Sequence, residues 1–457
     1  MNYKLLFNSF IFLLLHYSVL VTAQIYPDQH YELRIDSIFA NIEVNQGIKL
    51  SDDGKFIMLE DSVTNGYVEL KTQTSAQPFN HGLPSWNGSA LGNNSSFKIQ
   101  MRFPYGGGWS PWLTVGFWKK NIWAVYGTTS YGGGFVDIDY VKLNSYQNSW
   151  QFKIIMTRTS VAEPSPTIHK LSFFVSDSRT TTNVNITQIV NDNPDPIFIP
   201  TTFIYQYGVD PVIGGDICSP TTVSMILKSY DIEVDPYQFA LDTRDPYYNL
   251  FGVWPRVVQN AAEFGLDGAV TRYRTWSEAR EVLDNGGRIA MSVGQPLYSG
   301  HLFMLAGFTN DGRPIVHDPA KSSGYSYIYN KTSISQAWFN KGGIAYTFYP
   351  EDGATSVEIP ENKIIADNFG LYQNYPNPFN PSTVISWQSA ISSHQTLKVY
   401  DILGNEIAVL VDEYLPAGRY SIEFNSSTIK NGLPSGIYFY QLRVGDFTSV
   451  KKMNLVK

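Results

Sequence analysis

The period of the hydrophobic pattern changes twice along this chain of 457 residues. Apolar and polar residues alternate in short runs over residues 24–196, and again from Leu371 onward. Between these regions, apolar residues first recur at intervals of three and four. Alternation with a period of two predicts strands, whereas spacing of three and four residues predicts helices. We therefore expect several domains, of which the outer two are all-β and the central one is α+β.

The first region contains runs such as FKIQMRF (97–103), WLTVGFW (112–118) and WQFKIIMTR (150–158), separated by Gly- and Asn-rich turns. This pattern predicts an antiparallel β-sandwich over residues 24–196. More than half of the chain's ten tryptophans lie in it: Trp86, Trp109, Trp112, Trp118, Trp123 and Trp150. Aromatic residues in strands mostly pack in cores, which is the interpretation we favour. If exposed, they would instead form a platform for a polysaccharide or a peptide.

The central region begins with helix signals and ends with strand signals. A helical stripe follows Cys218, a second helix is expected from Asp235-Pro236, and a capping box at Thr275 and Glu278 begins another. Three strands are then expected, at RIAMSVG (288–294), HLFMLAGF (301–308) and RPIVHD (313–318). Helices followed by an antiparallel sheet predict an α+β fold.

Proline-rich and polar stretches mark the expected domain boundaries. Val190–Thr202, with three prolines, links the first sandwich to an α+β domain that we place at residues 197–350. Residues 351–370 form a second, polar linker. Only strand and turn signals follow, so residues 371–457 are expected to form a small all-β sandwich.

The first 23 residues have the composition of a secretory signal peptide. Lys4 supplies a positive charge, residues 5–21 are mostly apolar, and Val21-Thr22-Ala23 offers small residues before Gln24. A membrane anchor is the alternative. The apolar run is shorter than the roughly 20 residues that a span prefers, and His16 interrupts it. We therefore expect an exported chain with no transmembrane segment after cleavage.

The balance of charge and aromatic content narrows the range of partners. Charged residues make up 16% of the chain and aromatic residues 15%, which is more typical of extracellular β-rich modules than of a cytosolic enzyme. The formal net charge is −7, and no basic block accompanies it. Nucleic acid is therefore not an expected partner.

The chain has a single cysteine, Cys218. An exported protein with one cysteine forms no intramolecular disulfide, and an exposed thiol outside the cell is liable to oxidation. Cys218 is therefore either a small buried hydrophobe or a nucleophile. It follows the turn Gly214-Gly215-Asp216 and precedes the apolar stripe, which starts at Val223. A thiol at a helix N-terminus is favoured as the thiolate, so the position favours a nucleophile.

A thiolate nucleophile needs a proton acceptor nearby. Of the seven histidines, only His301 and His317 lie in the central region. His301 starts one predicted strand and Asp318 ends the next, and a turn at Asn310-Asp311-Gly312 would bring the two strands together. A lone histidine is more often a core or surface residue. The combination of Cys218, His301 and Asp318 in one domain is what indicates catalysis.

No metal or other cofactor is expected. No set of His, Cys and Asp residues has the spacing of a zinc site, and a metal bound to Cys218 would quench its nucleophilicity. The chain also has no phosphate-binding Gly-rich loop.

Three central segments carry a family resemblance: IYQYGVDPVIGGDICSPTTVSMILKSY (204–230), SGHLFMLAGF (299–308) and VHDPA (316–320). Together they resemble the peptidase domain of the bacteriocin-processing, papain-like cysteine peptidases, in particular its soluble secreted branch. The resemblance covers about residues 203–350. It implies a papain-like fold and hydrolysis of peptide bonds.

The resemblance also implies a role for each site residue. Cys218 would be the nucleophile, His301 the general base and acid, and Asp318 the carboxylate that orients His301. Gln206 lies where the family places its oxyanion-hole glutamine, and its amide N–H would act with the backbone N–H of Cys218. Processing members also carry a membrane transporter and an ATPase, for which this chain shows no signal. Its expected substrate is therefore an extracellular peptide or protein.

The last region carries a second resemblance, through LYQNYPNPFNPSTVISW (371–387), LKVYDILGNEIAVLV (397–411), LPAGRYSIEF (415–424) and LPSGIYFYQLRVGDFTSVKKMNLVK (433–457). These segments closely resemble the type A sorting domain of the type IX secretion system. The resemblance implies export through the periplasm of a two-membrane bacterium, with the secretion machinery as partner, to the medium or to the outer-membrane surface. A sugar-binding sandwich is the alternative.

These observations predict a secreted or cell-surface cysteine peptidase. Two alternatives remain open. The first is a surface adhesin or carbohydrate-binding protein whose peptidase-like domain is inactive. The second is an enzyme with the same three catalytic residues that acts as an amidase or a transpeptidase on cell-wall peptides.

Overall fold

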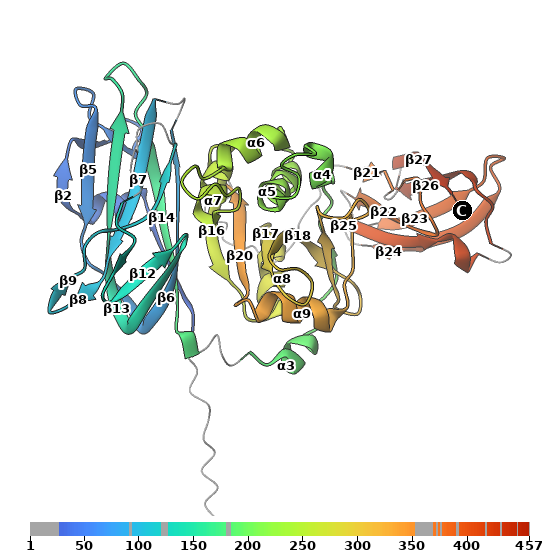
Figure 1. Cartoon of the computed structure of the whole chain (residues 1–457). Helices are drawn as coiled ribbons and strands as arrows, with labels where there is room; N and C mark the ends of the chain where they lie inside the picture. Colours follow the sequence, from blue (N-terminus) through green and yellow to red (C-terminus); the bar gives the residue numbers. More distant parts are fainter. Residues whose placement is uncertain are drawn as a thin grey trace, which may run out of the picture.

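The computed structural model is mostly β, and its strands form several sheets in succession along the chain (Figure 1). The predicted signal peptide at residues 1–23, Trp123, and most of the predicted linker at 351–370 lie outside the described residues. The structure describes residues 27–90, 94–119, 127–179, 184–351, 369–371, 373–374, 377–389, 393–415, 418–429, 432–445 and 447–456.

The N-terminal body, residues 27–179, is antiparallel throughout, as predicted. Its elements are β1 (Gln29–Arg34), α1 (Ile35–Ala40), β2 (Ile42–Gln46), β3 (Ile48–Leu50), β4 (Ile57–Leu59), β5 (Asn65–Leu70), β6 (Gln73–Ser89), β7 (Ser95–Arg102), β8 (Pro104–Tyr105), β9 (Gly108–Trp109), β10 (Leu113–Trp118), β11 (Ser130–Tyr131), β12 (Gly134–Asp137), β13 (Tyr140–Arg158) and β14 (Thr167–Ser176). Hydrogen bonds join 12 of these strands into one sheet. The long strand β13 holds the sheet together because it pairs with β6 and β12 near its start and with β7 and β5 further along.

One hydrophobic core serves this whole N-terminal body. Trp86, Trp118 and Trp150 are fully buried in it, so the prediction that tryptophans fill the core is confirmed for these three. Trp109 differs, because it lies on the short β8–β9 hairpin and is 36% exposed.

The central body, residues 184–351, combines helices with a six-stranded sheet of order β15-β18-β17-β20-β16, in which β19 also pairs with β18. Its elements are α3 (Ile186–Val190), β15 (Ile197–Phe198), α4 (Gln206–Val209), α5 (Cys218–Lys228), α6 (Pro236–Thr243), α7 (Trp254–Ala262), β16 (Leu266–Arg272), α8 (Trp276–Asp284), β17 (Arg288–Val293), β18 (His301–Phe308), β19 (Pro314–His317), α9 (Lys331–Phe339) and β20 (Ile344–Pro350). In Figure 1, α5, α6 and α7 gather at the top of this body and α9 lies at its bottom. No helix in the ranges given above is both long and apolar enough to span a bilayer.

The predicted helices and strands of the central body are present. Part of the expected first linker, however, is a strand of the central sheet. β15 lies inside Val190–Thr202 and pairs with β18, so this segment extends the central sheet. The turn between β18 and β19 occurs as predicted, with Gly312 at a φ of +70°. The domain boundaries themselves stay predictions.

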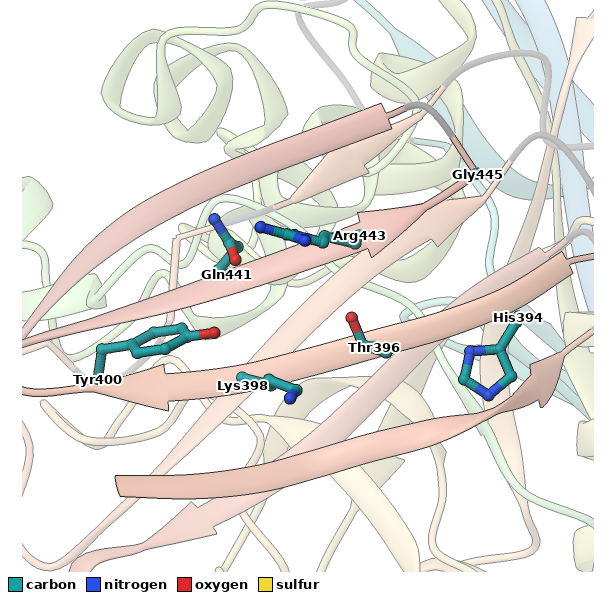
Figure 2. Close-up of a pocket in the computed structure, with 7 residues that line it drawn as sticks. All are labelled: His394, Thr396, Lys398, Tyr400, Gln441, Arg443 and Gly445. Atoms are coloured by element: carbon teal, nitrogen blue, oxygen red, sulfur yellow. The ribbon is translucent and has the colours of Figure 1, made fainter. Parts of the chain in front are cut away.

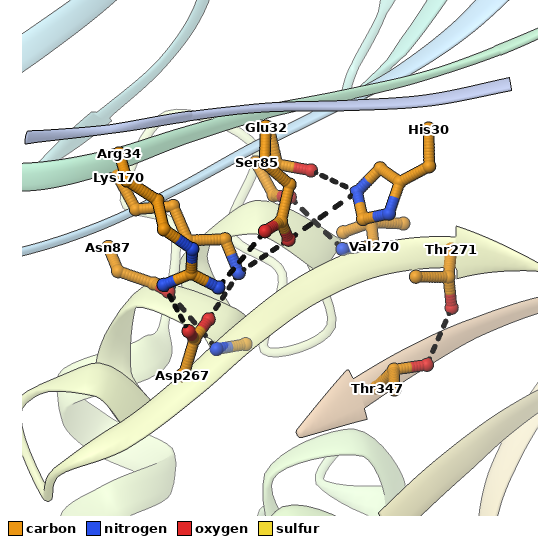
Figure 3. Close-up of polar contacts among 12 residues, drawn as sticks. His30, Glu32, Arg34, Ser85, Asn87, Lys170, Asp267, Val270, Thr271 and Thr347 are labelled. Carbon is orange, nitrogen blue, oxygen red and sulfur yellow. Dashed lines mark hydrogen bonds and ion pairs between the residues drawn. The ribbon is translucent and has the colours of Figure 1, made fainter. Parts of the chain in front are cut away.

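The N-terminal and central bodies share a polar interface along β16. The backbone N–H groups of Gly268 and Val270 donate to the side chains of Asn87 and Ser85 on β6. Figure 3 shows Lys170 reaching Asp267 on β16, with Arg34 beside it. These contacts cover the edge of the central sheet, where unpaired backbone groups would otherwise be exposed.

The C-terminal body, residues 369–456, has a three-stranded and a four-stranded sheet around its own core. Its strands are β21 (Gly370–Leu371), β22 (Ser382–Ser389), β23 (Ser393–Tyr400), β24 (Glu406–Leu415), β25 (Gly418–Asn425), β26 (Gly436–Val444) and β27 (Phe447–Leu455), with a short 3-10 helix at Ser426–Thr428. Gly404 and Gly445 have positive φ at the β23–β24 and β26–β27 turns. Glycine adopts this conformation without steric cost.

Candidate active site

Cys218 is the first residue of α5 and is partly exposed. Residues 219–227, which follow it, are all buried, so the helix is fixed in the core while its first residue reaches the surface. Gly214 makes the preceding turn possible, because a Cβ there would lie 2.6 Å from the carbonyl oxygen of Asp210. Cys218 thus stands at the N-terminus of the helix, as the sequence predicts, where the positive end of the helix dipole favours a thiolate.

His301 begins β18 and is 4% exposed. Its Nε2 donates to Oδ1 of Asp318 at 2.8 Å, which leaves Nδ1 as the ring nitrogen available to the sulfur of Cys218. Pairing of β18 with β19 brings the histidine and the carboxylate together, because Asp318 directly follows β19. The structure therefore brings together Cys218, His301 and Asp318.

Charge interactions favour the protonated form of the His301 ring. Burial alone would lower its pKa, but hydrogen bonds to Asp318 and Cys218, together with the negative charges of both groups, outweigh burial and raise the pKa of His301 to about 9. An imidazolium between a carboxylate and a sulfur can stabilise a thiolate and later donate a proton.

Asp318 is fully buried and accepts four hydrogen bonds. Its Oδ1 accepts from His301 and from the backbone N–H of Ala320, at 3.0 Å. Its Oδ2 accepts from the hydroxyls of Tyr298, at 2.7 Å, and Tyr329. Burial favours the neutral acid, but the bonds from His301 and the two tyrosines outweigh it and lower the pKa of Asp318. The carboxylate is therefore charged at neutral pH.

Tyr298 and Tyr329 were not identified from the sequence. Tyr298 also lies against the His301 ring, with centroids 4.2 Å apart, and its hydroxyl is 3.0 Å from that of Tyr329. The position of Tyr298, three residues before His301, was the one available signal. Tyr329 gave no signal, because only folding brings it to Asp318.

Gln206 is 2% exposed and lies between the loops that precede Cys218 and follow Asp318. Its Nε2 donates to the carbonyl oxygen of Gly214 at 2.6 Å, and its backbone N–H donates to the carbonyl oxygen of Pro319. One of the two Nε2 hydrogens is therefore engaged, and the other has no acceptor within the described part of the chain. The oxyanion role of Gln206 stays a prediction.

His317, the other histidine of the central body, has a structural environment. It is fully buried, its ring stacks on Tyr325 at 4.4 Å, and its nitrogens contact the carbonyl oxygen of Ile199 and the N–H of Ser326. Burial lowers the pKa of His317 to about 4, so the ring is neutral. Among the described residues, it is His301 and not His317 that contacts the Asp318 carboxylate, at 2.8 Å.

Two hollows elsewhere in the described part of the chain lack a combination of Cys, His and Asp. One of about 320 Å³ lies on the C-terminal body, where Figure 2 shows side chains of β23 and β26 projecting from one face. Its lining consists of His394, Thr396, Lys398, Tyr400, Gln441, Arg443 and Gly445. Another, of about 400 Å³, lies beside α4 and includes Tyr205.

In the described part of the chain, no group of three or more His, Cys, Asp or Glu residues could hold a metal ion.

Comparisons with known families agree with this geometry. Residues 198–346 match the peptidase C39 like family, and residues 373–456 match the secretion system C-terminal sorting domain. The chain carries a C39-like peptidase segment and a sorting domain. The sorting domain indicates export by the type IX system, to the cell surface or into the medium. A domain of this family implies the type IX secretion machinery.

Likeness to solved structures is weak. The chain is 10% identical to a β-glucuronidase from Faecalibacterium prausnitzii, with a TM-score of 0.14, covering 94% of this chain and 47% of that one. It is 11% identical to dimeric latent PorU from Porphyromonas gingivalis, with a TM-score of 0.16, covering 93% and 34%. The chain thus spans about half the length of the first and about a third of the second. No curated protein matches.

Proposed function

We propose that this protein is a secreted or cell-surface cysteine peptidase that hydrolyses peptide bonds of an extracellular substrate. The observation that supports this most is the His301 ring, which interacts with both the Cys218 thiol and the Asp318 carboxylate. The three residues lie in the segment that matches the C39-like family. Their catalytic roles are part of the proposal.

In the proposed reaction, the Cys218 thiolate attacks the carbonyl carbon of the scissile bond. Gln206 and the backbone N–H of Cys218 stabilise the oxyanion of the tetrahedral intermediate. His301 donates its proton to the leaving amine, which departs and leaves a thioester on Cys218. His301 then takes a proton from water, which hydrolyses the thioester and releases the acid. Asp318 holds the ring in one orientation throughout.

The test is chemical. Iodoacetamide should alkylate Cys218 rapidly near neutral pH in the full-length protein, and Cys218→Ala should abolish cleavage of fluorescently labelled casein and of a peptide library. Cys218→Ala also controls for a contaminating peptidase. A native thiol that alkylates as slowly as free cysteine, with no cleavage of any peptide, would contradict the proposal.

A second candidate function is binding of a polysaccharide by the N-terminal body, with an inactive peptidase-like segment. It is favoured by Tyr105 and Trp109, which are 49% and 36% exposed on the β8–β9 hairpin, and by Arg102, whose guanidinium lies 5.4 Å from the Trp109 ring centre. Polysaccharide binding that survives Cys218→Ala but is lost in Trp109→Ala, without peptide hydrolysis, would support it.

An amidase or a transpeptidase would use the same thioester with a different acceptor or substrate. Mass spectrometry of the products distinguishes the reactions. Hydrolysis adds water to the acyl half, whereas transpeptidation joins it to a second amine. Cleavage restricted to cell-wall peptides would indicate an amidase.

A further inference from the structure

An ammonium group lies beside the catalytic pair and has no role so far. Lys341 occupies the turn between α9 and β20, and its Nζ donates to the carbonyl oxygen of Val293 at 3.2 Å. Val293 pairs with His301 across β17 and β18. The Nζ atom also lies 3.9 Å from the position of a Cβ on Gly300, the residue before His301. Lys341 is therefore adjacent to the strand end that carries the proposed base.

Lys341 differs in its partners from four other lysines of the N-terminal and central bodies, although Lys331, like Lys341, bonds only to neutral oxygens among the described residues. Carboxylates lie within ion-pair distance of Lys142, Lys153, Lys170 and Lys228. For Lys341, the structure records one bond, to a neutral carbonyl, and no carboxylate at that distance among the residues it describes. Two N–H donors of a half-buried ammonium thus remain unused. A partly buried ammonium with unused N–H donors can bind an anion through charge-assisted hydrogen bonds.

Two negative groups act on Lys341 electrostatically, Cys218 first and then Asp139, and in the described part of the chain neither forms a hydrogen bond or an ion pair with its Nζ. Asp139 interacts with it electrostatically, but burial raises the pKa of Asp139 to about 7, and its Oδ2 already accepts from the N–H of Trp254. Arg272 adds a second cation. Its Nη1 lies 3.3 Å from the position of a Cβ on Gly342, and its Nε and Nη1 have no hydrogen-bond partner among the residues that the structure describes. The surroundings of Lys341 therefore favour an anion.

Lys341 and Gln206 lie on opposite sides of His301. β18, which starts with His301, lies between β19 and β17 in the sheet. Gln206 bonds to Pro319 on the β19 side, whereas Lys341 bonds to Val293 on the β17 side. Gln206 is the proposed oxyanion donor, and the leaving amine departs toward the imidazole that protonates it. Lys341 is therefore on the leaving-group side.

Glycines keep the ammonium accessible. A Cβ on Gly294 would lie 3.4 Å from Cδ of Lys341, and one on Gly300 would lie 3.9 Å from Nζ. Larger side chains at these two positions would cover the charge. A ligand can therefore approach Nζ from the surface beside His301.

We propose that Lys341 binds a carboxylate in the leaving-group half of the substrate, either an acidic side chain or the C-terminal carboxylate. The inference rests on the proposed peptidase function and names its substrate class. Lys341 is then a specificity-determining residue, and the preferred substrates are acidic peptides or peptides cleaved near their C-terminus.

The test uses four versions of the peptide that the full-length protein cleaves fastest. The leaving half contains Glu or Gln, and its C-terminus is a free acid or an amide, so the two sources of the carboxylate are separated. Lys341→Met should lower kcat/KM about tenfold to a hundredfold for the preferred carboxylate version, mainly through KM, because a hydrogen bond between charged groups is lost. The neutral version should change less than about threefold, and Lys341→Arg should restore most of the preference.

Lys228→Met is the matched control. It removes the same charge, but Lys228 pairs with Glu233 at the opposite end of α5 from Cys218. An equal loss on acidic and neutral peptides in Lys341→Met, or no loss on either, overturns the inference while leaving the peptidase function intact.

A measurement of peptide binding distinguishes this inference from the proposed peptidase function. In a Cys218→Ala chain, calorimetry measures the Kd of the carboxylate peptide and of its neutral counterpart, with and without Lys341→Met. A preference for the carboxylate that Lys341→Met removes supports the site even if the wild-type protein cleaves nothing, which would refute only the peptidase function. Absence of any preference refutes the carboxylate site.

Discussion

Asp318 is the residue on which the orientation of the His301 ring depends most. It is inaccessible to solvent, and each oxygen accepts two hydrogen bonds. The tyrosine hydroxyls on Oδ2 orient the carboxylate and so direct Oδ1 toward His301. A buried carboxylate that loses one donor keeps its charge but is held less firmly.

Removing one of these donors tests this view. Tyr329→Phe should lower kcat about tenfold, because a hydrogen bond to a charged group contributes about 1.5–3 kcal/mol and part of it orients His301. Steady-state kinetics on labelled casein measures the effect. Tyr327→Phe is the control, since Tyr327 packs beside Tyr329 but has no recorded bond to Asp318. Equal effects of the two substitutions would contradict the proposed orienting role.

The pKa of His301 sets the expected pH dependence. Because this pKa is raised from 6.5 to about 9, the imidazolium that donates to the leaving amine in the proposed reaction is lost as pH rises through about 9. We expect kcat/KM to fall over that range. The free energy of unfolding should fall over the same pH range. The contribution of His301 to it is fully present below pH 6.5 and disappears as pH rises through about 9.

Asp318→Asn is the informative variant for this prediction. It removes the negative charge that helps to raise the His301 pKa, so the alkaline fall in kcat/KM should move to lower pH. An alkaline limb that stays in place in this variant would show that another group titrates there.

At the scale of elements, local signals determine what the sequence could predict. Helix α6 begins as expected because the Asp235 side chain caps the N–H groups of Tyr237 and Gln238. Strand β16 was missed because all seven of its residues are buried, which removes the alternation that marks a half-buried strand. The same limit applies to the site. Cys218 and His301 stand at element starts, whereas Lys341 becomes their neighbour only through tertiary packing.

The capping interaction gives a prediction at this scale. Asp235→Ala should lower the free energy of unfolding by about 1 kcal/mol, because two N–H groups of the first turn lose their acceptor. Chemical denaturation measures the change. Asp235→Asn, whose side-chain oxygen still accepts, should stay close to wild type; equal destabilisation by both would point to the charge and not the cap.

At the scale of the whole molecule, the N-terminal and central bodies are joined by buried and partly buried hydrogen bonds as well as by the chain. Glu263, at the end of α7, accepts from the Trp118 indole, the Ser89 hydroxyl and the N–H of Ala90. Gln259 on the same helix donates to the carbonyl oxygen of Gly88. Separating the bodies would expose these groups together with the edge of β16, so each body stabilises the other.

We therefore expect calorimetry of the full-length protein to show one unfolding transition for these two bodies. Glu263→Ala leaves three donors at the interface without their acceptor and should lower the midpoint of that transition by several degrees, consistent with a loss of about 2–4 kcal/mol. Glu233→Ala, which removes an exposed carboxylate from the central body, is the control. Two separate transitions in the wild type, or an equal shift in the control, would mean that the N-terminal body is an independent module. Its exposed aromatic hairpin would then be free to act as a tethered binding domain.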